Sequence, residues 1–101
     1  MAGPYRAVTI RGISMTPLLH PGDIVCIDTL SYDIEKLRGK LVAAKIEVEG
    51  GVVIKRLGRK STLREFILLS ENAEENPPVI IKEPKHHVLI GEVVWMISRM
   101  L

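Results

Sequence analysis

The sequence predicts an all-β domain of small, strongly curved sheets with little helix, arranged as a small barrel or a pair of sheets. Short apolar, β-branched runs alternate with Gly, Pro and Asn along the chain, which is typical of many short strands joined by turns. Helical periodicity of the apolar residues is nearly absent. At 101 residues the chain can bury one modest core, so we expect a single domain over residues 1–101.

Each β-branched run is expected to form one strand. In chain order the expected strands are Tyr5–Ile10, Ile24–Asp28, Lys40–Val48, Val52–Leu57, Phe66–Ser70, Val79–Ile81 and Val88–Arg99. Single helical turns are expected after Thr16-Pro17 and at Ile34–Leu37.

One hairpin can be predicted in detail. Gly50-Gly51 lies between two strand-like runs and suits a two-residue turn that needs positive φ. Such a turn pairs Glu49 with Val52, Val48 with Val53, Ile46 with Lys55, and Ala44 with Leu57. Lys55 then shares an apolar surface with Ala44, Ile46, Val48, Val53 and Leu57, because side chains alternate between the faces of a strand. Arg56 lies on the opposite face and points to water. That face carries Lys45, Glu47 and Glu49 as well, mixed with the apolar Val52 and Ile54. A loop one residue longer would exchange the two faces.

A lysine on an apolar surface is chemically interesting. An ordinary lysine has a pKa near 10.4, so only about one in 2500 is neutral at pH 7. Burial disfavours the ammonium and can lower a lysine pKa by roughly 3–5 units. Such a lysine can act as the base for a weak oxygen nucleophile. The alternative is that the Lys55 stem covers apolar surface while its amine reaches water.

Ser14 is the candidate nucleophile. Gly12 and Pro17 bracket it closely, which predicts a defined backbone turn. Successive N–H groups in such a turn can bind the oxyanion of a tetrahedral intermediate. Met15 and Leu18 can form an apolar wall for a substrate side chain. The alternative is an ordinary loop serine.

The overall composition excludes several classes of protein. A net charge of +2 is too small to indicate nucleic-acid binding by itself. The single cysteine, Cys26, lies in an apolar run and predicts a small buried residue in a reducing compartment. No apolar stretch has the roughly 18 residues needed to span a bilayer, and the start of the chain does not resemble a signal peptide. We expect a cytoplasmic protein without a membrane association.

The histidines do not predict a metal site. His86 and His87 are adjacent on a strand and would point to opposite faces, and no carboxylate or cysteine stands at a useful spacing. His20 has no evident orienting partner, which favours a loop residue over a catalytic base. We therefore expect neither a metal nor another cofactor.

Together these residues resemble the LexA/UmuD-type serine–lysine peptidases, a family that includes the C-terminal halves of many phage repressors. The matching pieces follow one another in family order and span nearly the whole chain from Gly12. They are Gly12–Pro17, Pro21–Val25, Ile54–Leu57, Leu68–Asn72, Asn76–Pro78 and Ile90–Val94.

The resemblance implies a role for each candidate residue. Ser14 would attack a peptide bond, and Lys55 would accept its proton and pass it to the leaving amine. The backbone amides of Ile13 and Ser14 would stabilise the oxyanion. Family members mostly cut themselves at a small-residue pair upstream of the serine, when a RecA–single-strand DNA filament favours the cleavable conformation.

In repressors of this family, cleavage separates an N-terminal DNA-binding domain from a C-terminal dimerisation domain. The resemblance therefore implies a homodimer through the last strand, around Val93–Met100. The alternative is a central strand buried on both faces. Only 13 residues precede Ser14, so we expect a fragment or processed product that does not bind DNA directly. Ala2-Gly3 has the composition of a scissile pair but lies closer to Ser14 than the family arrangement suggests.

Three further functions remain open. A UmuD-like accessory subunit of a lesion-bypass polymerase would carry a short N-terminal arm in place of a DNA-binding domain. A dimerisation or effector domain would keep these residues without catalysis. Type I signal peptidases share a Ser-Met-x-Pro and a lysine, but they normally carry a membrane anchor and a longer catalytic region.

Overall fold

The computed structural model describes residues 3–46, 51–85 and 88–97, which form one seven-stranded sheet in the order β1-β2-β7-β3-β4-β5-β6. Every strand pairing in it is antiparallel. The elements are β1 (Tyr5–Thr9), β2 (Ile24–Asp28), α1 (Ile34–Leu37), β3 (Leu41–Ile46), β4 (Gly51–Leu57), β5 (Glu65–Leu69), β6 (Val79–Lys82) and β7 (Leu89–Ile97). The all-β class is confirmed, with one continuous sheet in place of a pair.

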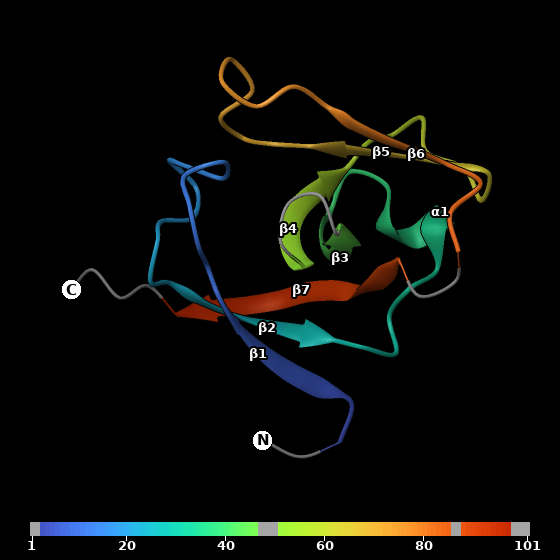
Figure 1. The fold of residues 1–101 in the computed structure, drawn as a ribbon. Coiled ribbons are helices and arrows are strands. Elements are labelled where there is room, and N and C mark those ends of the chain that lie inside the picture. The colour runs from blue at the N-terminus through green and yellow to red at the C-terminus, as the bar shows by residue number, and fades with distance from the viewer. Residues whose placement is uncertain (1–2, 47–50, 86–87, 98–101) are drawn as a thin grey trace.

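The sheet is strongly curved. In Figure 1, β5 and β6 lie above the β3–β4 hairpin, whereas β7, β2 and β1 lie below it, so the sheet turns through the hairpin. The short helix α1 lies inside this bend beside β3. Its N-cap Asp33 accepts a hydrogen bond from the Glu35 amide at 3.0 Å, which satisfies one of the free donors of the first turn.

Two hydrophobic clusters pack against opposite faces of the β3–β4 hairpin. The helix-side core contains Ile34, Leu37, Val42, Ala44, Ile46, Leu57, Phe66, Leu68 and Leu89. The loop-side core contains Ile10, Met15, Leu19, Val25, Ile27, Ala43 and Ile54. Successive residues of β3 therefore enter different cores, which explains the unbroken apolar run in this strand. Burying each large aliphatic side chain contributes about 1.5–3 kcal/mol.

The β3–β4 hairpin does not have the predicted register. Ile46 pairs with Gly51 and Val42 pairs with Lys55, whereas a two-residue turn places Ile46 opposite Lys55. Gly51 begins β4, and the connecting residues 47–50 lie outside the described part of the chain. All four predicted cross-strand pairs, Glu49–Val52, Val48–Val53, Ile46–Lys55 and Ala44–Leu57, are wrong.

The two faces of the hairpin are nevertheless as predicted, because the observed register differs from the predicted one by an even number of residues. Lys55 lies on the face of Val42 and Val53, which belong to or pack against the helix-side core. The opposite face is more buried than predicted, since Ile54 belongs to the loop-side core. Arg56, predicted to point to water, is only half-exposed.

A close backbone approach fixes the crossing of β2 and β7. A Cβ added at Gly91 would clash with the backbone carbonyl of Asp28. Gly91 also lies opposite Ala43 of β3, beside a register shift between Ala43 and Ala44. Glycine is required here because the strands pass too closely for any side chain.

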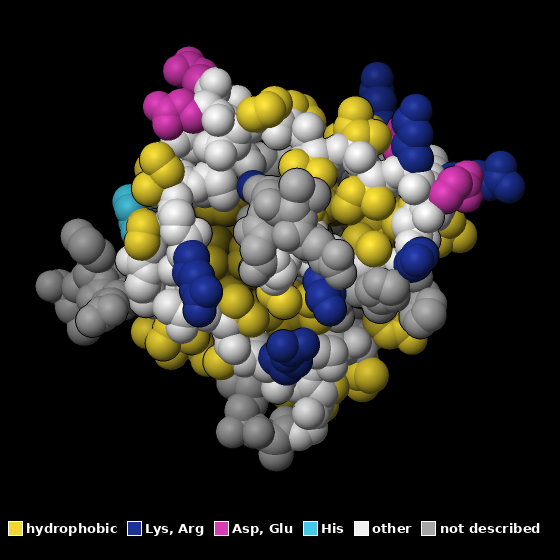
Figure 2. All heavy atoms as spheres, in the orientation of Figure 1, with side chains coloured by type: hydrophobic (Ala, Val, Ile, Leu, Met, Phe, Trp, Pro, Cys, Tyr) yellow, Lys and Arg dark blue, Asp and Glu magenta, His cyan; other side chains and the backbone are white. Residues whose placement is uncertain are grey.

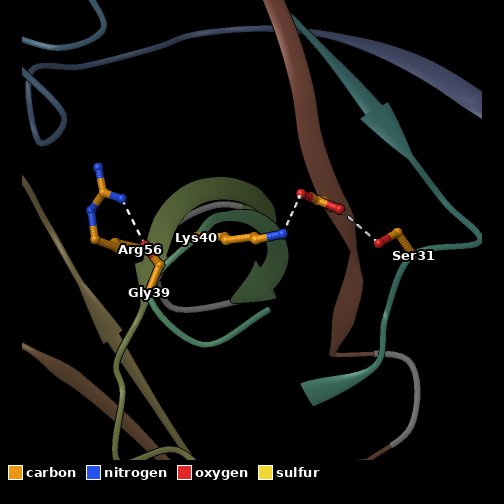
Figure 3. Close-up of polar contacts among 5 residues, drawn as sticks. Ser31, Gly39, Lys40 and Arg56 are labelled. Atoms are coloured by element: carbon orange, nitrogen blue, oxygen red, sulfur yellow. Dashed lines mark hydrogen bonds and ion pairs between the residues drawn. The ribbon is translucent and has the colours of Figure 1, made fainter. Parts of the chain in front are cut away.

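A polar cluster joins the central strands at the surface (Figure 3). Glu92 of β7 accepts a hydrogen bond from Ser31 Oγ at 2.8 Å and forms an ion pair with Lys40 Nζ at 3.7 Å. In the same view, Arg56 Nη1 donates to the carbonyl oxygen of Gly39 at 2.8 Å. The Lys40 side chain is 55% exposed, so its ion pair adds little stability.

The second half of β7 is exposed, although the strand lies between β2 and β3. Val94, Trp95, Met96 and Ile97 are each at least 42% exposed. The alternative of a last strand buried on both faces is therefore wrong for this half. Within the described ranges, no helix has the length and apolar character needed to cross a membrane.

Candidate active site

Ser14 lies on a loop whose two ends are joined by backbone hydrogen bonds. The Ile10 amide donates to the Asp23 carbonyl at 2.8 Å, and the Gly22 amide donates to the Ile10 carbonyl at 3.0 Å. Gly12 has φ of 72°, a conformation that glycine adopts without steric cost and that turns the chain just before the serine. Ser14 is therefore presented on a closed, braced loop.

The loop is held from inside as well as at its ends. Met15 and Leu19 are fully buried in the loop-side core, and the Leu19 amide donates to the Met15 carbonyl at 2.8 Å. The predicted turn is present, but it begins before Pro17, since the Thr16 amide donates to the Ile13 carbonyl at 3.0 Å.

Lys55 is buried, at 2% relative exposure. Its Nζ donates a hydrogen bond to Ser70 Oγ at 2.8 Å. Among the described residues, no buried side-chain nitrogen or oxygen lacks a hydrogen-bond partner. The amine is thus held in a fixed place in the interior, and the alternative in which it reaches water is wrong.

Three consecutive residues after β5 join the lysine to the serine loop. Ser70 accepts from Lys55, Glu71 pairs with Arg56 at 2.7 Å, and the Asn72 amide donates to the Ser14 carbonyl at 2.9 Å. The same short segment therefore fixes both the buried amine and the backbone of Ser14.

A groove of about 690 Å³ runs beside Ser14. Its walls come from two distant parts of the chain and from Asn76. They are Arg6, Ala7, Val8, Thr9, Ile10, Arg11, Gly12, Ile13, Ser14 and Met15 on one side, with Val52, Val53 and Ile54 on the other. In Figure 2, hydrophobic side chains (yellow) line a hollowed area left of the centre of the view.

Both strands that line the groove have an open edge in the described part of the chain. β1 is the outermost strand and pairs only with β2. β4 pairs with β5 only at Arg56 and Leu57, so the preceding residues of β4 have no strand on that side. Open edges offer backbone N–H and C=O groups that can pair with an extended peptide.

The candidate residues are placed unequally around this groove. Ile13, Ser14 and Met15 line it, whereas Leu18 does not and is 38% exposed. His20 is exposed, and its amide donates to the Asp23 carboxylate at 2.9 Å, which agrees with a loop role. The catalytic, oxyanion and substrate roles of these residues stay predictions.

None of the other candidates that the structure describes lines the groove. His86 and His87 lie outside the described residues. In the remainder, no three His, Cys, Asp or Glu side chains are grouped closely enough to hold a metal ion. Cys26 is buried in β2.

Sequence reasoning missed two parts of the site. Ser70 lies in Leu68–Asn72, one of the segments that match the family. The sequence alone does not indicate which side chain a serine after a strand will contact. The β1 wall was missed because groove formation depends on how the sheet curves. The structure shows β1 as nearly fully exposed. The mixture of polar and apolar residues in Tyr5–Thr9 was the sequence signal that could have indicated an outer strand.

The fold and the site define a small antiparallel β domain with a serine on a braced loop and a buried lysine fixed by the same segment. Residues 2–94 match the family model described as Peptidase S24-like. The chain belongs to this peptidase family, and the resemblance to LexA/UmuD-type peptidases is confirmed. A comparison with curated proteins found no match.

Proposed function

We propose that this chain is the self-cleaving serine peptidase and dimerisation domain of a LexA-like or prophage transcriptional repressor. Ser14 is the nucleophile and Lys55 the general base. The observation that carries the proposal is the buried Lys55 amine, bonded to Ser70 in the segment that also holds Ser14. The family match supports peptidase chemistry at this site.

In the first half of the reaction, the neutral Lys55 amine accepts the hydroxyl proton as Ser14 Oγ attacks the scissile carbonyl carbon. The negative charge that develops on the carbonyl oxygen is stabilised by the amides of Ile13 and Ser14. Collapse of this intermediate breaks the C–N bond, and the Lys55 ammonium gives its proton to the leaving amine. The acyl group remains on Ser14.

The second half releases the acyl group. Lys55, neutral again, accepts a proton from a water molecule as that water attacks the ester carbon. Collapse of the second intermediate returns the proton to Ser14 Oγ and frees the new carboxylate. The Ser70 hydroxyl bond holds the amine in one position through both halves, so Ser70 acts as a positioning residue.

The groove gives the substrate its shape. An extended segment can pair with the open edges of β1 and β4 and pass beside Ser14. We propose that this segment is supplied in cis by the complete gene product, at a small-residue pair upstream of the domain. A RecA–single-strand DNA filament is the proposed activator.

The exposed end of β7 supports the dimerisation part of the proposal. Trp95 and Ile97 lie on one face of β7, where Ile97 pairs with the exposed Ile24 of β2, and Val94 and Met96 lie on the other face. Exposed apolar side chains grouped in this way mark an interaction surface. A second copy of the chain is the proposed partner.

Analysis of fragments from the complete gene product tests the proposal. The wild-type protein should yield one fragment beginning upstream of Ser14, whereas Ser14→Ala and Lys55→Ala should stay intact under the same conditions. Fragment masses and N-terminal sequences give the readout. Folded variants that still cleave would refute the dyad. An intact wild type, even with an activated RecA filament, would favour a dimerisation or effector domain, and a short upstream arm would favour a UmuD-like subunit.

A further inference from the structure

The groove beside Ser14 has an unbalanced charge. Its lining contains two cations, Arg6 and Arg11, whereas its other described lining residues are uncharged. In Figure 2, dark blue basic side chains surround the hollowed area, while the magenta acidic ones lie at the upper corners of this face. The charged side chains among the described lining residues are therefore all positive.

The strand register places Arg6 on the groove side of β1. Arg6 pairs with Ile27, and Val8 pairs with Val25. Ile27 and Val25 are buried in the loop-side core, and Val8 packs against it. Since cross-strand partners share a face, Arg6 projects from this same face, at the end where the core gives way to solvent.

Neither arginine is committed elsewhere in the described structure. Both are exposed, and the recorded ion pairs of the described residues, Lys40–Glu92 and Arg56–Glu71, do not include them. Exposed guanidinium groups keep their charge at every accessible pH and bind carboxylates in bidentate geometry. They are available to a ligand in the groove.

We propose that the groove selects extended peptide segments that carry acidic side chains, with Arg6 and Arg11 as the specificity-determining residues. As part of a cleavage reaction, this selection rests on the proposed peptidase function. The two arginines are five positions apart. Arg6 lies in β1 and Arg11 two residues beyond its end at Thr9, and both line the groove. A segment with two acidic residues can engage both, with one of them near the bond that Ser14 attacks.

A polypeptide fits the groove better than a nucleic acid does. The groove offers unpaired strand edges and an apolar floor of Val8, Val52 and Ile54, which suit a peptide backbone with alternating side chains. Two arginines provide too few charges for a nucleic-acid backbone, whose binding rests on many phosphate contacts.

Peptide binding to the full chain carrying Ser14→Ala tests this proposal. The probes are three fluorescein-labelled peptides with the same Ala-Gly centre and with Glu, Gln or Lys at two positions spaced as Arg6 and Arg11 are. Fluorescence anisotropy should show the Glu peptide binding about tenfold more tightly than the Gln peptide, with the Lys peptide weakest. The preference should shrink at about 0.5 M salt, because exposed charges are screened.

Arginine variants connect the preference to the groove. Arg6→Gln and Arg11→Gln should each weaken the Glu peptide about three- to fivefold and leave the Gln peptide unchanged. Arg64→Gln is the matched control, because Arg64 is exposed and outside the groove lining. Equal binding of the Glu and Gln peptides, or equal effects of Arg6→Gln and Arg64→Gln, would overturn the proposal.

Cleavage by the wild-type chain separates this proposal from the peptidase function. Preferential binding of the Glu peptide supports the groove proposal even where the complete gene product shows no Ser14-dependent self-cleavage, a result that would count against the peptidase alone. Equal cleavage of all three peptides supports the peptidase and overturns the groove proposal. A lower oligomer mass in Arg6→Gln, without peptide binding, would show that a second copy occupies the groove and would also overturn it.

Discussion

Lys55 brings an amine into the interior of the sheet, where a charge is costly unless it is hydrogen-bonded. The Ser70 hydroxyl meets part of this need at 2.8 Å. The bond also fixes the direction of Nζ, and in the proposed mechanism this amine must reach the Ser14 hydroxyl at the moment of attack. A single side chain after β5 thus affects both stability and the proposed chemistry.

Removing this hydroxyl should affect both properties. We expect Ser70→Ala to lower the free energy of unfolding by about 1–3 kcal/mol, because a buried donor loses a partner. Self-cleavage should slow by at least tenfold, and Ser70→Thr should restore much of it because the hydroxyl is retained. Urea unfolding and the rate of fragment formation provide the two measurements.

Ser61→Ala is the matched control for that variant. Ser61 is also buried, but its hydroxyl donates to the Ile67 carbonyl and accepts from the Ile67 amide, away from the lysine. It should lose stability without a matching loss of cleavage in the folded protein. Equal slowing in both variants would mean that Ser70 contributes only through stability.

The residue scale was also where sequence reasoning went furthest. The residues alone left an ordinary loop serine and a surface lysine open, and the resemblance to the peptidase family selected Ser14 and Lys55 as a pair. Alternation placed Lys55 on an apolar surface, on the condition of a two-residue turn, and left open whether its amine reaches water. Its bond to Ser70 could not be predicted, because it joins two strands whose relative position depends on the tertiary fold.

Among the elements, the β3–β4 hairpin shows what sequence patterns can and cannot specify. Alternation in Leu41–Ile46 and Gly51–Leu57 specifies the faces, because each face has its own core. It does not distinguish registers that differ by an even shift, since these bury the same side chains. The glycine pair suggested a tight turn, but Gly51 pairs with Ile46 inside the ladder.

The strand boundaries were easier to predict. All seven expected strands are present among the described residues, and Ile24–Asp28 and the helical turn Ile34–Leu37 have the expected limits. Local signals suffice here because Gly, Pro and charged residues interrupt each apolar run.

Strand crossing leads to a prediction for β7. We expect Gly91→Ala to lower the free energy of unfolding by about 3 kcal/mol, because a methyl group there meets the Asp28 carbonyl and the backbone must shift. Chemical denaturation measures the loss. Val94→Ala, in the exposed half of the same strand, should cost far less, and equal costs would contradict the close approach.

At the scale of the whole molecule, the groove and the exposed end of β7 both belong to one curved sheet. The curvature brings residues near Arg6 beside Ile54, which strand-by-strand reasoning cannot anticipate. The exposed end of β7 belongs to a strand that is central in the sheet.

The proposed dimer can be tested through this exposed end. We expect Trp95→Glu to convert a dimer into a monomer, because Trp95 is 45% exposed within the apolar patch and a carboxylate would be buried by association. Sedimentation equilibrium measures the mass. Leu63→Glu, at an exposed position between β4 and β5, is the control and should leave the mass unchanged. A wild-type monomer at all concentrations would contradict the proposed partner.

Self-cleavage of the complete gene product by the wild type and by Lys55→Arg tests the central claim, the Ser14–Lys55 dyad, most directly. The wild type should cleave at a first-order rate that is independent of protein concentration, because the nucleophile, the base and the scissile bond belong to one chain. Lys55→Arg keeps a positive charge and cannot accept the serine proton, so it should not cleave. Cleavage by a folded Lys55→Arg protein would contradict the dyad.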